Sequence, residues 1–222
     1  MPQSMNSSVS STPVHIFLDN SNIFYGAQGA AARHGEGGVA RCVRLYYEHL
    51  LHLARAGRQV ERAVCVGTIP SRDENVFRTR LERAGCIPEL YPGTVGAREQ
   101  GIDQALQVHM LRTVIDGWHG APGVAVLLTG DGAGIEAGSG FLADLQRLYE
   151  YGWGVEVLSW EHSCSRRLRD WTERVGAFVS LDAHYESVTF VEGGRRPTPP
   201  NLTRNRPFAF PANPEELEDL AA

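Results

Sequence analysis

Three aspartates occupy positions where a carboxylate is poorly suited to simple packing. Asp19 directly follows an apolar run at residues 14–18, and Asp131 closely follows a second apolar run at residues 124–128. Both runs have the length and composition of buried β-strands. An ionised carboxylate beside a core is costly unless a cation or hydrogen-bond donors meet it. Asp103 lies in the first turn of the helix expected before the second run and could reach the same place.

The chemistry that suits three such side chains is the binding of a hard divalent cation. Converging carboxylates cannot all stay ionised without compensation, because like charges raise one another's pKa. Mg²⁺ is bound through carboxylates and waters, and such an ion activates water and polarises a phosphoryl oxygen. The pattern therefore predicts a Mg²⁺ or Mn²⁺ site that hydrolyses phosphodiesters. Asn20 and Asn22 would orient ligands or water, and Thr129 would hydrogen-bond within the same network.

Each aspartate also has a purely structural explanation. Asp19 could cap a turn, and Asp131 could cap the glycine-rich segment that follows it. Asp103 would suit the positive end of a helix dipole. Asp182, which ends the last expected strand, is better explained as a cap. Asp19 and Asp131 share one design, since each ends a buried strand, and this repetition favours a common site.

The elements that must position these side chains alternate between strand and helix, which is typical of a parallel sheet covered on both faces. The expected strands are at residues 14–18, 62–67, 87–91, 124–128, 154–158 and 177–181, with a strand or hairpin arm at 185–192. The expected helices are at residues 39–56, 71–84, 102–116, 141–151 and 163–171, and a Gly/Ala-rich loop is expected at 25–38. In such α/β folds ligands bind beyond the carboxyl ends of the strands. Asp19 and Asp131 therefore share one cleft if their strands are neighbours.

The composition predicts one domain at residues 13–192, between a polar leader at 1–12 and a Pro-rich, acid-ended tail at 193–222. No apolar run approaches the ~20 residues of a membrane span, and the leader lacks the apolar segment of a secretory signal. The four cysteines form no CxxC pair, which argues against a cysteine zinc site and favours reduced thiols. We therefore expect a cytoplasmic protein.

At this point the motifs carry a resemblance. The segments FLDNSNIFYG, EQGIDQALQVHML, VLLTGDGAG and GWGVEVLSW resemble the NYN family of PIN-like ribonuclease domains, also called LabA-like, over residues 14–182. The resemblance implies a three-layer, Rossmann-like fold whose mostly parallel sheet has the strand order 3-2-1-4-5, with helices on both faces. It also implies metal-dependent cleavage of RNA at a cluster formed by Asp19, Asn22, Asp103 and Asp131.

Two departures from the family pattern bear on activity. The family commonly has an acid two residues after the Asp131 position, where this chain has Ala133, and often another six residues after Asp103, where it has His109. His109 is kept as a supporting residue, although a half-buried structural histidine is the commoner case. A thinner acid cluster could hold one cation weakly. It could also belong to an RNA-binding or protein-interaction module that cuts poorly or not at all.

The partners expected from the sequence are RNA, single-stranded or structured, and no membrane. All 21 basic residues are arginine, which binds phosphate bidentately and stacks on bases. Arg72, Arg98, Arg166 and Arg167 are the candidate RNA contacts; the alternative is an ordinary solvated surface in a chain from a GC-biased genome. The net charge of −5 argues against a sequence-blind grip on a polyanion. A DNA nuclease, a phosphatase, a protein partner for the tail and a homodimer stay open.

Overall fold

A six-stranded parallel sheet forms the centre of the protein. The structure, a computed structural model, describes residues 12–69, 74–92, 99–116, 122–133 and 138–200. The strand order is β4-β3-β1-β5-β6-β7. The bounds are Val14–Asp19 for β1, Val60–Ile69 for β3, Ile87–Pro92 for β4, Val124–Leu128 for β5, Gly154–Ser159 for β6 and Ala177–Ser180 for β7. The predicted order of five strands is therefore confirmed, and the strand at 177–180 extends the sheet by one at its edge.

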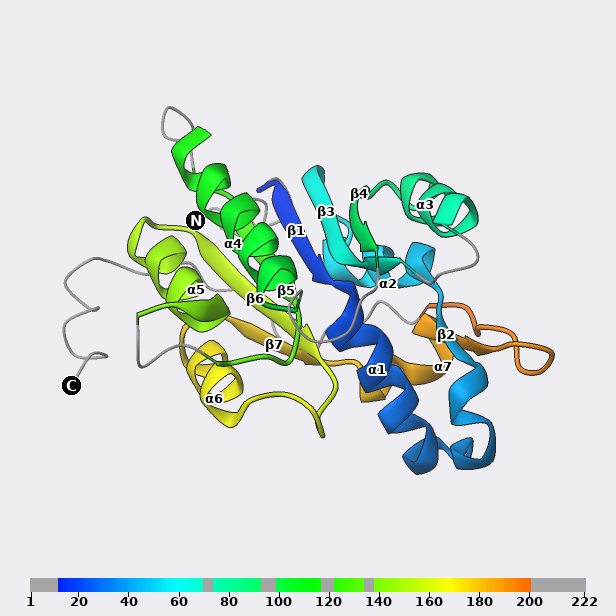
Figure 1. Cartoon of the computed structure of the whole chain (residues 1–222). Coiled ribbons are helices and arrows are strands. Elements are labelled where there is room, and N and C mark those ends of the chain that lie inside the picture. Colours follow the sequence, from blue (N-terminus) through cyan, green and yellow to red (C-terminus); the bar gives the residue numbers. More distant parts are fainter. Residues whose placement is uncertain (1–11, 70–73, 93–98, 117–121, 134–137, 201–222) are drawn as a thin grey trace, which may run out of the picture.

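Helices cover both faces of this sheet, so the fold has three layers (Figure 1). One layer holds α1 (Asn20–Ala30), α2 (Tyr47–Arg55), α3 (Glu74–Arg83) and α7 (Tyr185–Val188), and the other holds α4 (Glu99–Asp116), α5 (Gly140–Glu150) and α6 (Arg166–Val175). Alternation along β1 divides the core, because Ile16 and Leu18 enter the first layer's cluster and Phe17 enters the second. Most strand residues are apolar for this reason.

The register of the sheet brings the ends of two strands together at one edge. β1 pairs with β5 in parallel, and Leu18 lies opposite Leu128. The next residues along the two strands are Asp19 and Thr129, so both leave the sheet at its carboxyl edge. The condition stated from the sequence, that the strands carrying the two aspartates are neighbours, is met.

Two predictions for residues 25–56 are wrong. The expected loop at 25–38 is largely helical, since α1 runs to Ala30 and short 3-10 helices follow at Ala31–His34 and Gly37–Cys42. The expected helix at 39–56 begins only at Tyr47, because Val39 has non-helical dihedral angles and Val43–Leu45 form strand β2. β2 pairs antiparallel with β8 (Thr189–Val191) in a separate ribbon.

The glycines in α1, which favoured a loop from the sequence, allow close packing. A Cβ atom at Gly26 would lie 2.3 Å from Cδ1 of Trp160, and one at Gly29 would lie 2.4 Å from Nε2 of His162. Trp160 is fully buried and donates a hydrogen bond from Nε1 to the carbonyl of Ile23 at 2.8 Å. The helix tolerates the low propensity of glycine because tertiary packing requires it.

The start of the expected tail stays attached to the domain. Arg195 donates from Nε to Oε1 of Glu36 at 2.6 Å, and the backbone N–H of Thr198 donates to the carbonyl of Glu186 at 2.9 Å. Residues 1–11 of the leader and residues 201–222 of the tail lie outside the described residues. The four cysteines are free thiols. Within the described ranges, no helix has the length and apolar character needed to cross a membrane.

Arg58, which precedes β3, and Glu156 on β6 form a buried ion pair, and a prediction about stability follows from it. Arg58 donates two parallel hydrogen bonds to Glu156, at 2.7 and 2.8 Å, and both side chains are almost fully buried. We expect Arg58→Ala to lower the free energy of unfolding by about 3–5 kcal/mol, because it leaves the buried Glu156 carboxylate without its cationic partner. Urea denaturation measures this loss. The exposed neighbour Arg55→Ala should change stability by less than about 0.5 kcal/mol.

Candidate active site

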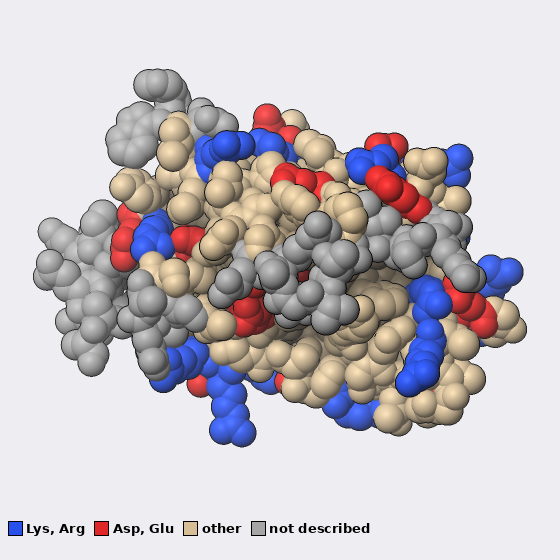
Figure 2. Space-filling model, in the orientation of Figure 1, with Lys and Arg blue, Asp and Glu red and all other residues tan. Residues whose placement is uncertain are grey.

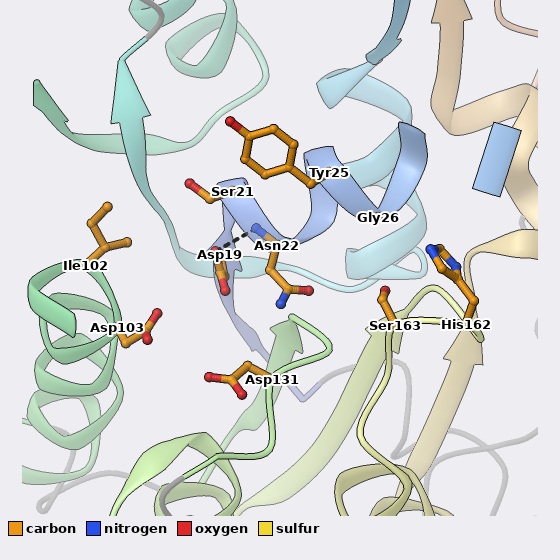
Figure 3. A pocket seen from close by; sticks show the side chains of 10 residues that line it. All are labelled: Asp19, Ser21, Asn22, Tyr25, Gly26, Ile102, Asp103, Asp131, His162 and Ser163. Carbon is orange, nitrogen blue, oxygen red and sulfur yellow. Dashed lines mark hydrogen bonds between the residues drawn. The ribbon is translucent and has the colours of Figure 1, made fainter. Parts of the chain in front are cut away.

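A pocket of about 440 Å³ opens at the carboxyl edge of the sheet, beyond β1 and β5 (Figure 3). Three aspartates from distant parts of the chain line it, together with residues from α1 and from the segment after β6. The lining residues are Asp19, Ser21, Asn22, Tyr25, Gly26, Ile102, Asp103, Asp131, His162 and Ser163. None of these ten residues is an arginine, so within the described part of the chain no side chain with a permanent positive charge lines this pocket.

Asp19 ends β1 and also caps α1. It is only 5% exposed. One carboxylate oxygen accepts a hydrogen bond from the backbone N–H of Asn22 at 3.1 Å, and the other accepts one from the hydroxyl of Thr129 at 2.9 Å. The capping role weighed from the sequence is therefore present. It uses part of the hydrogen-bonding capacity of the carboxylate, and none of the described residues that line the pocket is an arginine that could neutralise its charge.

The surroundings of Asp19 favour its neutral form. The pKa of Asp19 is raised from 3.8 to about 6; burial is the largest cause, and the nearby Asp131 carboxylate also raises it. The hydrogen bonds from Asn22 and Thr129 act in the opposite direction and lower the pKa. A nearby cation would strongly stabilise the ionised form of this buried carboxylate, which is the property expected of a metal ligand.

Asp131 and Thr129 form a turn that is tied to α1. Asp131 accepts a hydrogen bond from the backbone N–H of Ala133 at 2.9 Å, and its own N–H donates to the Thr129 hydroxyl at 3.2 Å. The side-chain oxygen of Asn22 accepts from the N–H of Gly130 at 2.8 Å. This network fixes Asn22, Thr129 and the two aspartates relative to one another.

Asp103 reaches the pocket from the opposite helical layer. It lies on α4 beside Ile102 and lines the pocket across from α1 (Figure 3). Because α4 begins at Glu99, Asp103 stands in the second turn of the helix and not in its first. The helix-dipole explanation for Asp103 is weakened accordingly.

The donor set fits a cation bound largely through water. Among the described residues, no three of His, Cys, Asp or Glu lie close enough to hold a metal ion together. Mg²⁺ usually takes only one or two carboxylates, with waters and substrate phosphate oxygens filling its other positions. Asp19 and Asp131, which interact electrostatically, are the pair that could supply these carboxylates.

Several residues singled out from the sequence lie elsewhere. Asn20 is buried and accepts a hydrogen bond from the hydroxyl of Tyr47 at 2.6 Å, so it does not line the pocket. His109 points to another part of the sheet, where Nε2 meets Glu89 and Nδ1 meets Arg62. Both expectations of a direct role at this pocket need correction, because protein partners already occupy these side chains.

The proposed arginine contacts divide into two groups. Arg72 and Arg98 lie outside the described residues. Arg166 and Arg167 are exposed at the start of α6, where basic side chains gather on the surface (Figure 2). They do not line the pocket, although a neighbouring hollow of about 480 Å³ shares Asp131 with it and extends to Ser165, directly before Arg166.

The sequence analysis missed His162, at the rim of the pocket. Nδ1 of His162 lies 2.5 Å from a guanidinium nitrogen of Arg33, which also donates to Asp182 at 3.1 Å. Since guanidinium only donates, Nδ1 accepts and the proton of the neutral ring is on Nε2. Burial and then Arg33 lower the pKa of His162. The rule that ligands bind beyond strand ends, applied to β6, could have found this residue.

The comparisons with known proteins agree with this architecture. The sequence model of the NYN domain family matches residues 13–175. No curated protein matches the chain. A crystal structure of a protein of unknown function from Vibrio parahaemolyticus is similar, with a TM-score of 0.58 and 19% sequence identity over 81% of this chain and 96% of that chain. At this identity the likeness shows the fold alone.

The raised pKa of Asp19 leads to a prediction about the stability of the protein in EDTA. A folded-state pKa raised from 3.8 to about 6 means that the native state loses stability as pH rises through that window. Asparagine retains the cap without the charge. Asp19→Asn should therefore be more stable than the wild type by about 2–3 kcal/mol near pH ~7, with a smaller difference at pH ~4.

Denaturant unfolding of both proteins across this pH range measures the difference. The exposed Asp170→Asn on α6 is the matched control and should follow the wild type. If Asp19→Asn is less stable than the wild type at neutral pH, the negative charge of Asp19 does not destabilise the native state and the assignment is wrong.

Proposed function

The chain belongs to the NYN domain family, and from this premise we propose that it is a metal-dependent ribonuclease. It hydrolyses RNA phosphodiesters at the pocket lined by Asp19, Asp103 and Asp131. The observation that carries the proposal is that aspartates from three separate segments line one pocket, and that no arginine is among the described residues of its lining. A site built to receive an anion directly would not be lined in this way.

The residues of the chain have distinct roles in this proposal. Mg²⁺ or Mn²⁺, when bound, supplies the Lewis acidity that activates water and stabilises charge on the phosphate. Asp19 and Asp131 hold the cation, and Asp103 orients a water from the facing helix. Asn22 and Thr129 hold the two carboxylates in place through the hydrogen bonds to Gly130 and Asp19. Burial of Asp19 excludes bulk water from one side of the site.

A single-stranded substrate is favoured by the aromatic side chain at the rim. Tyr25 is 64% exposed and lines the pocket from α1, on the same helical face as Ser21 (Figure 3). An exposed aromatic ring gives an unpaired base a surface on which to stack. On the other side, the neighbouring hollow leads from Asp131 towards Arg166 and Arg167, which would contact phosphates.

A non-catalytic RNA-binding or protein-interaction module is the second candidate. It is favoured by the absence of a three-ligand group among the described residues and by Ala133, which stands where the family commonly has an acid. This alternative requires RNA binding that is unchanged by EDTA and no cleavage at any Mg²⁺ or Mn²⁺ concentration. A cytoplasmic location remains part of the proposal in either case.

The first functional prediction concerns the cation and its ligands. Purified protein should cleave single-stranded RNA in Mg²⁺ or Mn²⁺, and EDTA should stop the reaction. Asp19→Asn and Asp131→Asn should each lower kcat by at least about 100-fold, since each removes charge that holds the cation. Gel analysis of labelled RNA measures the rate. Asp170→Asn, on the exposed face of α6, should retain wild-type activity.

Because Asp19→Asn is expected to be more stable than the wild type, its loss of activity could not be ascribed to unfolding. Equal cleavage by Asp19→Asn and the wild type, or cleavage that persists in EDTA, would exclude the metal chemistry. A parallel panel of single-stranded DNA and a phosphomonoester separates ribonuclease from DNA nuclease and phosphatase activity.

The second functional prediction concerns Tyr25. Tyr25→Leu should raise KM for single-stranded RNA about tenfold and change kcat little, because a stacked base contributes roughly 1–3 kcal/mol. Tyr25→Phe keeps the ring and should restore the wild-type KM. Steady-state cleavage kinetics make the measurement. If leucine serves as well as phenylalanine, the base does not stack at this position.

A further inference from the structure

A second pocket, of about 270 Å³, lies where the start of α2, the end of α3 and the β2–β8 ribbon meet. These elements are on one side of the molecule (Figure 1). We call it the arginine pocket, and its lining residues are Leu45, Tyr46, Tyr47, Glu48, Arg80, Arg83, Phe190 and Arg196. Neither the family assignment nor the candidate active site accounts for it.

Its charge is unusual for a chain with a net charge of −5. Arg80 and Arg83 stand one helical turn apart on α3, and Arg196 comes from the segment after β8. Within the described part of the chain, none of the three guanidinium groups has a hydrogen-bonded or ion-paired partner. Glu48 is the one acid in the lining, and the hydroxyl of Tyr46 donates to it at 3.0 Å.

The helix dipole explains only part of this arrangement. Arg80 and Arg83 lie in the last turn of α3, where cations are favoured. Arg196 belongs to a different segment, so the dipole of α3 does not explain why Arg196 lines the same pocket. Three like charges that line one pocket repel one another, and a bound anion would offset this repulsion. The pocket is therefore suited to a phosphate, which arginine binds with paired hydrogen bonds.

The walls add a surface for a base. The rings of Tyr46 and Phe190 are partly exposed, and the buried Tyr47 and Leu45 form the apolar wall behind them. The volume lies just below the ~300–1,000 Å³ range of ligand pockets, so the pocket suits one nucleotide and not a duplex. Guanidinium groups beside aromatic rings are the usual combination for binding single strands.

The arginine pocket also adjoins the framework of the candidate active site. Tyr47 forms part of its wall and donates the 2.6 Å hydrogen bond to Asn20, the residue directly after Asp19. We propose that the arginine pocket is a second RNA-binding site, which holds one nucleotide of a single-stranded RNA outside the segment that is cut. The choice of RNA as the ligand rests on the proposed function.

The test measures binding without cleavage. A fluorescent single-stranded RNA is titrated in EDTA with the full chain, with Arg80→Gln/Arg83→Gln and with Arg196→Gln. Each variant should bind about tenfold more weakly, with a salt dependence that is shallower by ~0.7 for each phosphate contact removed. Arg174→Gln, an exposed arginine at the far end of α6, is the matched control and should bind like the wild type.

Thermal unfolding of each variant shows that the fold is intact, which is expected because the altered side chains are exposed. Unchanged affinity and salt dependence in both arginine variants would overturn the proposal. Titration with AMP distinguishes the source of the nucleotide. AMP binding that requires Arg83 and Arg196, with RNA affinity unchanged, would mean that the pocket holds a free nucleotide and would also overturn it.

This experiment is independent of the metal chemistry. If the arginine variants lose RNA affinity while the wild type cleaves nothing in Mg²⁺ or Mn²⁺, the second binding site stands and the ribonuclease proposal fails. If the wild type cleaves RNA and the variants bind as it does, the ribonuclease proposal stands and the second site fails.

Discussion

The architecture of the site depends on one buried carboxylate, that of Asp19, which is shared between two elements. Its two oxygens accept from the Asn22 N–H on α1 and from the Thr129 hydroxyl after β5. These bonds hold the start of α1 against the turn at Thr129. The side chain of Asn22 adds a third connection by accepting a hydrogen bond from the N–H of Gly130. The same burial that makes Asp19 a good structural joint makes its negative charge unfavourable. A structural cap and a cation ligand are therefore not competing explanations for this residue.

The central strands β1, β5 and β6 could be predicted from the sequence because they are mostly apolar runs buried between the two layers. Residues 25–56 could not, since local propensity and tertiary packing disagree there. Gly26 is poor for a helix by itself, but only a residue without a Cβ atom allows α1 to pack on Trp160. Val43 looked like part of an amphipathic helix, yet it pairs with Val191, which is 148 positions later in the sequence.

The site was predictable to a similar degree and for similar reasons. Asp19, Asp131 and Thr129 follow strands, so the rule for strand ends finds them, and the family pattern finds Asp103 on its helix. Asn20 and His109 have suitable chemistry and spacing, but their side chains are directed to Tyr47 and to Glu89. Sequence spacing places a residue on an element. It does not say which partner on a neighbouring element claims the side chain.

The separation of charge over the surface has a consequence for how RNA could approach. An acidic pocket repels a polyanion, and the ten residues that line it include no arginine. In the proposed function, the attraction would come from a bound cation at the centre and from arginines at a distance, such as Arg166 on α6 and Arg83 beside the β2–β8 ribbon. Such an arrangement discriminates against non-specific binding, because a strand gains full contact only when it spans both the cation and a basic anchor. The negative net charge argues against tight, sequence-independent binding of nucleic acid, but it is compatible with selective binding.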